Sequence, residues 1–129
     1  MQTFSKEERL CSKKQIDQLF EKGEKFKEGS FAVILQETKA KSEFPAKILI
    51  SIPKRNIPKA NQRNMLKRLL KECYRKQKES LYQVLLQKEK QIIFAIIYQG
   101  TDVLKYKELE SEINLILNRL KEISFEKTI

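Results

Sequence analysis

The spacing of apolar residues separates the helices of this chain from its strands. Apolar residues recur three and four positions apart, as on one face of a helix, in segments 12–23, 62–86 and 109–123. Short runs rich in β-branched and aromatic residues, typical of strands, are 31–36, 46–52 and 92–98. The predicted order is helix, strand, strand, helix, strand, helix. This order predicts a single α/β (α+β) domain over 1–129, a two-layer sandwich with helices against a short sheet.

Local signals predict where the helices begin and end. Ser12 followed by Gln15 predicts a capping box for the first helix, and Gly23 predicts its end. Asn56 or Asn61 could cap the second helix, with Pro58 in its first turn.

The strand pattern also predicts pairing. Segments 31–36 and 46–52 are most simply an antiparallel hairpin with a long loop, and 92–98 is continuously apolar, as expected in the middle of a sheet. The first ten residues show no periodicity, so we expect them to be a loose lead-in.

Positive charge is concentrated in residues 54–78. This stretch holds ten Lys and Arg residues and one acid, Glu72, so it carries +9 of the formal net charge of +10. On a helical wheel six residues of the second helix share an arc of about 140°: Arg63, Asn64, Lys67, Arg68, Lys71 and Arg75. The apolar residues fall on the opposite side: Leu66, Leu69, Leu70 and Cys73. Solvated helices normally pair opposite charges, so a nearly unpaired cationic face favours RNA or DNA as its partner.

The candidate nucleic-acid-binding residues lie on this arc and in the turn before it. On the arc are Arg63, Asn64, Lys67, Arg68, Lys71 and Arg75, and in the turn are Lys54, Arg55 and Lys59. An Arg fork holds a phosphate through two hydrogen bonds, whereas Lys acts as a compact charge. Free amides at the helix start add to the attraction for an anion. From chemistry alone, Asn64 could equally be an indifferent polar surface residue.

Two segments resemble the protein subunit of bacterial ribonuclease P. RNMLKRLLKECYR, from Arg63 to Arg75, resembles the Arg-Asn-Arg signature helix of that family, and it follows a strand and basic turn, ILISIPKR, as in the family. RLCSKKQIDQLFEKGEKFKEGSFAVIL, from Arg9 to Leu35, is similar to the family's opening helix and first strand. The chain departs from the pattern at Met65, where the family usually has its second Arg, and at Lys71, where another Arg is common.

The resemblance implies a fold, a function and partners. The fold has a left-handed crossover around the basic helix, although right-handed crossovers dominate in general. The function is that of a ribonuclease P protein subunit, which binds ribonuclease P RNA and precursor tRNA, with one protein per RNA, and supports removal of the 5′ leader. In this family Asn64 would contact RNA. The chemistry and its Mg²⁺ belong to the RNA, so we expect no cofactor on protein ligands.

The resemblance also implies a groove for the single-stranded 5′ leader, lined by Ile16, Phe20 and Ile34. Aromatic side chains in such a groove stack on bases of any sequence. This chain has Ile16 and Ile34 where aromatic residues are frequent in the family. The alternative is that these residues, with Phe31, are all part of the core.

Composition excludes several other kinds of site. The chain has no His, and Cys11 and Cys73 are far apart, which excludes the usual zinc sets and His-based catalysis. The carboxylates are dispersed, so we expect no catalytic residue in this chain. No stretch approaches about 18 apolar residues and the N-terminus lacks a signal core, so we expect no membrane contact and a cytoplasmic location.

Three alternatives remain open. A general RNA-binding or ribosome-associated protein would need the same basic helix. A protein-only nuclease would have to turn over by itself with a metal. A DNA-binding module would need a turn and recognition helix, which the pattern does not show.

Overall fold

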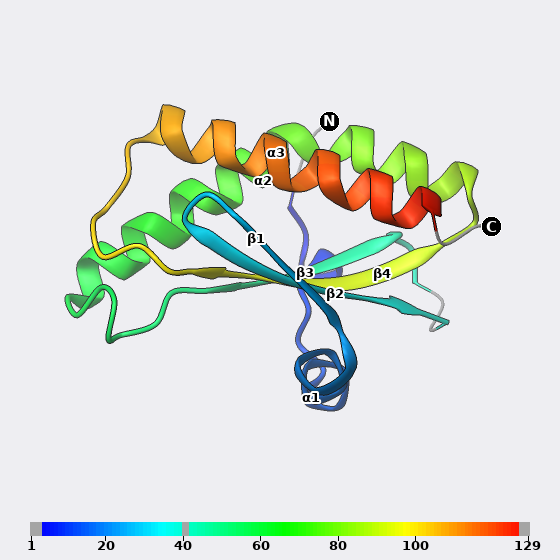
Figure 1. Cartoon of the computed structure of the whole chain (residues 1–129), viewed down its shortest axis with the longest axis horizontal. Helices are drawn as coiled ribbons and strands as arrows, with labels where there is room; N and C mark the ends of the chain where they lie inside the picture. The colour runs from blue at the N-terminus through cyan, green and yellow to red at the C-terminus, as the bar shows by residue number, and fades with distance from the viewer. Residues whose placement is uncertain (1–3, 40–41, 127–129) are drawn as a thin grey trace.

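The chain folds around a four-stranded sheet with helices on both faces (Figure 1). The computed structural model describes residues 4–39 and 42–126. The elements are the 3₁₀ helix η1 (Lys6–Glu8), α1 (Lys13–Lys22), β1 (Glu24–Glu28), β2 (Phe31–Thr38), β3 (Ala46–Ser51), α2 (Ala60–Gln87), β4 (Gln91–Tyr98) and α3 (Tyr106–Glu126). Helices α2 and α3 cover one face, which gives the predicted sandwich, and α1 lies against part of the other face (Figure 1).

The strands are arranged in the order β1-β2-β4-β3. β4 lies between β2 and β3 and is almost entirely buried, so the prediction that 92–98 is the middle of the sheet is confirmed. β4 is antiparallel to β2 and parallel to β3. Parallel neighbours need a crossover connection, and α2 provides it between β3 and β4.

The predicted hairpin of 31–36 with 46–52 is wrong. β2 and β3 each pair with β4 and not with each other. The continuously apolar β4 must be covered on both faces, so it takes the central position and separates them. The hairpin that does form joins β1 to β2 through Gly29, whose φ of +57° is a conformation that glycine adopts without penalty.

The apolar pattern did not predict β1. Four of its five residues are charged, and only Phe26 packs against the main core, with the guanidinium of Arg119 centred 4.2 Å from its ring. β1 is an edge strand, where charged side chains are common because they prevent pairing with another sheet. The predicted element order therefore lacks one strand.

Residues 4–11, the N-terminal segment, are docked on the protein, so the expected loose lead-in is wrong over its described part. Leu10 is buried and its N–H donates to the carbonyl of Ile48 at 2.9 Å, while Arg9 forms a parallel bridge with the same residue. In Figure 1 the described part of this segment begins on the side of the sheet that α2 covers and passes the edge strand β3 to reach α1 on the other side. Residues 1–3, which that prediction also covered, lie outside the described chain.

The predicted positions of the ends of α1 are confirmed, and of the predicted capping box the Ser12 hydrogen bond is present. The Ser12 hydroxyl accepts a hydrogen bond from the Gln15 amide at 3.3 Å, and the Gly23 amide donates to the Leu19 carbonyl at 2.8 Å. A Cβ at Gly23 would lie 2.6 Å from Cγ2 of Ile34. The glycine therefore allows α1 to approach β2 closely.

Candidate nucleic-acid interface

The N-terminal half of α2 has the two faces that its sequence predicts. Its apolar residues are buried or half-buried against the sheet: Leu66, Leu69, Leu70 and Cys73. On the other side Asn64 and Arg68 are exposed, and Lys67 and Lys71 are half-buried. This half of the helix therefore presents cations on a fixed backbone.

The cationic face ends after Lys71. At about 100° per residue, Tyr74 and Lys78 continue the same stripe, yet both are buried. The N-terminal segment covers them, because Phe4 packs edge-on against Tyr74 with ring centroids 5.7 Å apart and the Glu8 carboxylate accepts a hydrogen bond from Lys78. The charge of Lys78 is thus matched inside the protein.

Glu72, the single acid of the basic stretch, pairs with Arg75. Nε and Nη2 of Arg75 donate to the two carboxylate oxygens at 2.9 and 2.6 Å. These hydrogen bonds lower the pKa of Glu72 and raise the pKa of Arg75. The expectation that the arc is uncompensated is therefore wrong at Arg75, whose contact with RNA stays a prediction.

Arg63 stabilises the turn that precedes α2. Its Nη1 donates to the carbonyls of Ile57 and Pro58 at 3.0 and 2.7 Å. Part of its guanidinium is therefore already bound, and the remaining donors are those left for an RNA contact.

Neither predicted asparagine caps α2. Lys59 is the N-cap residue and makes no side-chain cap, so Pro58 lies just before the helix and not in its first turn. The side chain of Asn56 donates instead to the carbonyl of Tyr98 at 2.9 Å, which ties the turn to the end of β4. The Asn61 side chain accepts from the neighbouring Gln62 amide at 2.9 Å.

The turn before α2 displays three of the predicted cations. The amides of Asn56 and Ile57 both donate to the Pro53 carbonyl, at 3.1 and 3.2 Å, and Ile57 is buried. Lys54, Arg55 and Lys59 are exposed on this anchored backbone. An anion at the start of α2 would meet them together. These three cations precede Lys67 and Arg68, which lie in the first half of α2.

A hollow of about 210 Å³ lies between the N-terminal segment, β3 and α2. Arg9, Lys67 and Lys71 line it, together with the apolar surface of Phe4 and Leu49. Burial, and then repulsion from Arg9 and Lys67, lowers the pKa of Lys71. Among the described residues, no carboxylate forms an ion pair with any of these three cations.

Of the residues that line this hollow, only Lys67 and Lys71 were among the predicted site residues, and Arg9 and Phe4 were not. Arg9 lies in the segment that resembles the ribonuclease P protein, and that match was the available signal. Phe4 carried no signal, because the N-terminal segment has no periodicity and its partner Tyr74 is far away in the sequence.

The predicted groove residues have different environments. Phe20 is 38% exposed and Ile16 is half-buried, so both can contact a ligand. Ile34 is only 5% exposed in the small core beneath α1, so it offers little surface to a ligand, and its place in the groove stays a prediction. Half-exposed Leu49 and Ile97 contact the same small core and supply apolar surface on this side of the sheet.

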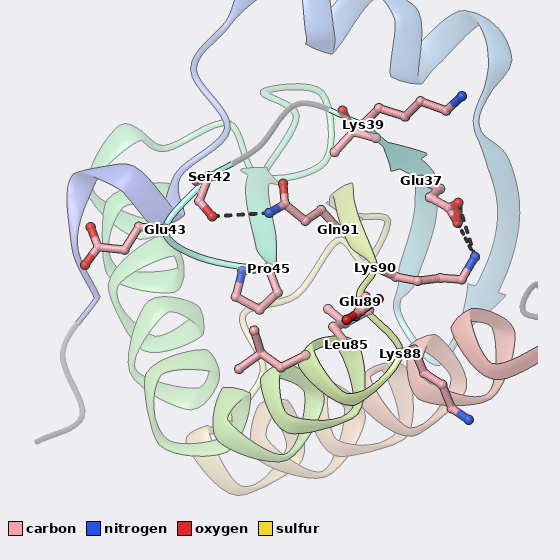
Figure 2. A pocket seen from close by; sticks show the side chains of 12 residues that line it. Glu37, Lys39, Ser42, Glu43, Pro45, Leu85, Lys88, Glu89, Lys90 and Gln91 are labelled. Atoms are coloured by element: carbon pink, nitrogen blue, oxygen red, sulfur yellow. Dashed lines mark hydrogen bonds and ion pairs between the residues drawn. The ribbon is translucent and has the colours of Figure 1, made fainter.

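A larger hollow, of about 660 Å³, lies at the other end of α2 (Figure 2). Its lining carries three carboxylates and three lysines, and Lys90 pairs with Glu37 at 2.7 Å (Figure 2). Because its charges are balanced, this hollow lacks the excess of cations found at the N-terminal end of α2.

Comparison with known proteins agrees with this geometry. The family model described as Ribonuclease P matches residues 4–121. The chain belongs to the ribonuclease P family. The match includes the N-terminal segment, the anchored turn and all of α2.

Curated relatives within the ribonuclease P family are of moderate identity. The ribonuclease P protein component of Chlorobium phaeobacteroides is 36% identical over 83 residues, which cover 62% of this chain and 57% of that protein. The component of Legionella pneumophila strain Corby is 35% identical over 75 residues, covering 58% of this chain and 63% of that protein. The chain thus matches less than two thirds of the length of these relatives.

Solved ribonuclease P proteins share the fold. The Staphylococcus aureus protein superposes with a TM-score of 0.69 at 17% identity, over 87% of this chain and 94% of that chain. The Thermotoga maritima protein gives a TM-score of 0.67 at 20% identity, over 87% and 96%. The four-stranded sheet with three α-helices is therefore the ribonuclease P protein fold.

Other kinds of site are not apparent in this family member. Within residues 4–39 and 42–122, no three His, Cys, Asp or Glu side chains gather so that they could hold a metal ion. None of the helices in the described chain combines the length and apolar character needed to cross a bilayer. Both cysteines have free thiols, Cys11 exposed and Cys73 buried.

Proposed function

We propose that this chain is the protein subunit of a bacterial-type ribonuclease P and works with a catalytic RNA to remove the 5′ leader of precursor tRNA. The family membership supports this proposal. The observation that carries it is the group of exposed or half-buried cations on the first half of α2 and its turn, for which the described residues provide no acidic partner. We call this group the cationic surface: Lys54, Arg55, Lys59, Lys67, Arg68 and Lys71.

The cationic surface would neutralise phosphates of the ribonuclease P RNA. Such contacts fix position and supply affinity without reading sequence. Asn64 is exposed between these cations and can donate or accept a hydrogen bond there. Met65, in place of the family's second Arg, is 41% exposed and uncharged, so this position cannot supply an ionic contact.

The leader would lie on the α1 side of the sheet, beside Phe20 and Ile16. One exposed ring offers one stacking platform, so base stacking contributes less in this chain than phosphate binding does. The chemistry and its Mg²⁺ would belong to the RNA, and one protein would bind each RNA in the cytoplasm. The protein then acts by positioning the scissile bond and raising affinity.

Reconstitution tests the proposal. The full chain, added to a bacterial ribonuclease P RNA at low Mg²⁺, should accelerate removal of the leader from precursor tRNA. Lys67→Glu/Arg68→Glu/Lys71→Glu should abolish the acceleration, because it replaces three attractions by repulsions. Lys105→Glu/Lys107→Glu/Lys121→Glu, with the same change of net charge beside and on α3, should retain it.

Other outcomes identify the alternatives. RNA binding without acceleration would indicate a general RNA-binding or ribosome-associated protein. Cleavage by the chain alone with a metal would indicate a protein-only nuclease. Tighter binding of duplex DNA than of precursor tRNA would indicate a DNA-binding module.

A further inference from the structure

The N-terminal segment alternates between inward and outward side chains as it passes β3. Glu8 is 1% exposed, Arg9 is exposed, and Leu10 is again buried. Arg9 has extended backbone, with φ −92° and ψ 137°, and bridges to Ile48 of β3. In extended backbone, successive side chains point to opposite sides. A contact that holds Glu8 inward therefore also holds Arg9 outward.

The Glu8 carboxylate is bound by three donors. Lys78 and the Tyr82 hydroxyl, both on α2, donate to Oε1, the latter at 2.9 Å, and the Ser5 amide donates to Oε2 at 2.6 Å. Lys78 is 6% exposed, and its ammonium lies 5.8 Å from the centre of the Phe4 ring. A buried ion pair adds little stability over apolar residues of similar size, but it demands one geometry from both partners. The contact thus fixes the position of the segment along α2.

The position of the N-terminal segment determines where the charge of Arg9 lies. Its guanidinium is 5.3 Å from the centre of the Phe4 ring, and it lines the hollow with Lys67 and Lys71. Because the two charges share this hollow, repulsion from Arg9 contributes to the lowered pKa of Lys71. Three cations facing one hollow form a stronger phosphate site than the two that α2 provides by itself.

We propose that the buried Glu8–Lys78 pair is a positioning element for RNA binding, which holds the N-terminal segment on α2 so that Arg9 joins Lys67 and Lys71 on one stretch of RNA backbone. This inference rests on the proposed function. Glu8 and Lys78 are positioning residues that never touch the RNA, and Arg9 is the residue through which they act.

A variant that raises the net charge can distinguish a positioning role of Glu8 from a simple effect of net charge on RNA binding. Glu8→Gln raises the net charge by one, so it would tighten RNA binding if only overall charge mattered. We expect the opposite, a several-fold weaker binding of a bacterial ribonuclease P RNA. Glu37→Gln is the matched control, since it removes a carboxylate paired with Lys90 at 2.7 Å at the other end of α2 and gains the same charge. It should leave RNA binding unchanged or slightly tighter.

A double-variant cycle gives the decisive measurement. Glu8→Gln/Lys78→Met removes the pair without leaving a buried charge, so it is the variant expected to stay folded. In the wild-type chain, Arg9→Gln should reduce the slope of log K against log salt by about 0.7–0.9. In the background of Glu8→Gln/Lys78→Met, Arg9→Gln should not change this slope further. Exchange of the Leu10 amide, which donates to Ile48, should accelerate in the double variant because the segment detaches.

Each result decides one of the two proposals. A full effect of Arg9→Gln in the double-variant background, or no effect in the wild-type chain, would overturn the positioning role and leave the proposed function intact. Unchanged protection of Leu10 would overturn it as well. A wild-type chain without salt-dependent RNA binding would overturn the proposed function, and the positioning role with it.

Discussion

Lys67 and Lys78 lie on the same stripe of α2, about three turns apart, and have opposite surroundings. Lys67 lines an open hollow, whereas Lys78 is buried against Glu8. Arg63 and Arg75 are intermediate, because each guanidinium already donates to an acceptor of the protein. The sequence predicts that the helix is basic. It does not predict which cations are matched internally, since Glu8 is 70 positions from Lys78 and shares no pattern with it.

The first prediction concerns this difference between cations. Lys67→Gln should reduce the slope of log K against log salt by about 0.7–0.9, the value for one phosphate contact. Arg75→Gln should reduce it less, because Glu72 already holds the guanidinium. RNA titrations between about 50 and 200 mM salt measure both. Lys90→Gln, at the far end of α2, is the control with the same loss of charge, and an effect equal to that of Lys67→Gln would contradict the prediction.

The second prediction concerns the stability of the buried pair. Lys78→Met should lower the free energy of unfolding by about 3–5 kcal/mol, because it leaves the Glu8 carboxylate buried without its cation. Glu8→Gln/Lys78→Met should recover most of this loss. Urea unfolding at neutral pH measures both variants. A double variant no more stable than Lys78→Met alone would mean that the cost does not come from the unpaired charge.

The third prediction is the direction of acid sensitivity. Burial tends to raise the pKa of Glu8, but hydrogen bonds from Lys78, Ser5 and Tyr82 outweigh it and hold the pKa below its ordinary value of 4.5. The unfolded chain therefore takes up the proton first as the pH falls. The contribution of Glu8 to stability is present above pH 4.5 and is lost as the pH falls through the lower pKa of the folded state. The wild-type chain should lose more unfolding free energy than Glu8→Gln/Lys78→Met between neutral and acidic pH, and equal losses would contradict this.

At the scale of elements, helices were predicted well and strand partners were not. The second helix, predicted over 62–86, spans Ala60–Gln87, because its apolar period is local information. The pairing of β2 with β4 depends on contacts across more than fifty residues, which no turn signal encodes. β1 has one apolar side chain, so no apolar pattern in the sequence indicates that it forms an edge of the sheet.

The fourth prediction tests the close approach of α1 to the sheet. A methyl group at Gly23 would lie 2.5 Å from the Leu19 carbonyl oxygen and 2.6 Å from Cγ2 of Ile34. Gly23→Ala should therefore destabilise the fold by about 1–3 kcal/mol, the usual cost of overpacking. Thermal unfolding measures the effect. Glu21→Ala, at an exposed position of the same helix, should change stability by less than about 0.5 kcal/mol, and a similar loss in both variants would contradict the packing explanation.

At the scale of the whole molecule, the excess of positive charge is concentrated in residues 54–78, which carry +9 of the formal net charge of +10. The turn before α2 and the first half of that helix carry the cationic surface, whereas the far end of α2 has balanced charges (Figure 2). Sequence composition predicted the excess charge and its approximate place. The contribution of Arg9 depends on the N-terminal segment crossing from α2 to α1, which only the fold reveals (Figure 1).

The fifth prediction follows from the number of these cations. Six phosphate contacts, one for each member of the cationic surface, give a slope of log K against log salt of about −4 to −5, and the contact proposed for Arg9 makes it steeper by about 0.7–0.9. Titration of the wild-type chain with ribonuclease P RNA measures it. A slope near zero would show that the surface does not bind the RNA electrostatically.

The two thiols differ in exposure and in pKa, so one of them can carry a fluorescent label that reports RNA binding. Cys11 is exposed at the hollow beside Arg9 and Lys67, whereas Cys73 lies in the core, where burial raises its pKa to about 11. A maleimide fluorophore should therefore attach to Cys11 alone in the native protein, without any engineered cysteine. Its emission would follow RNA docking in real time.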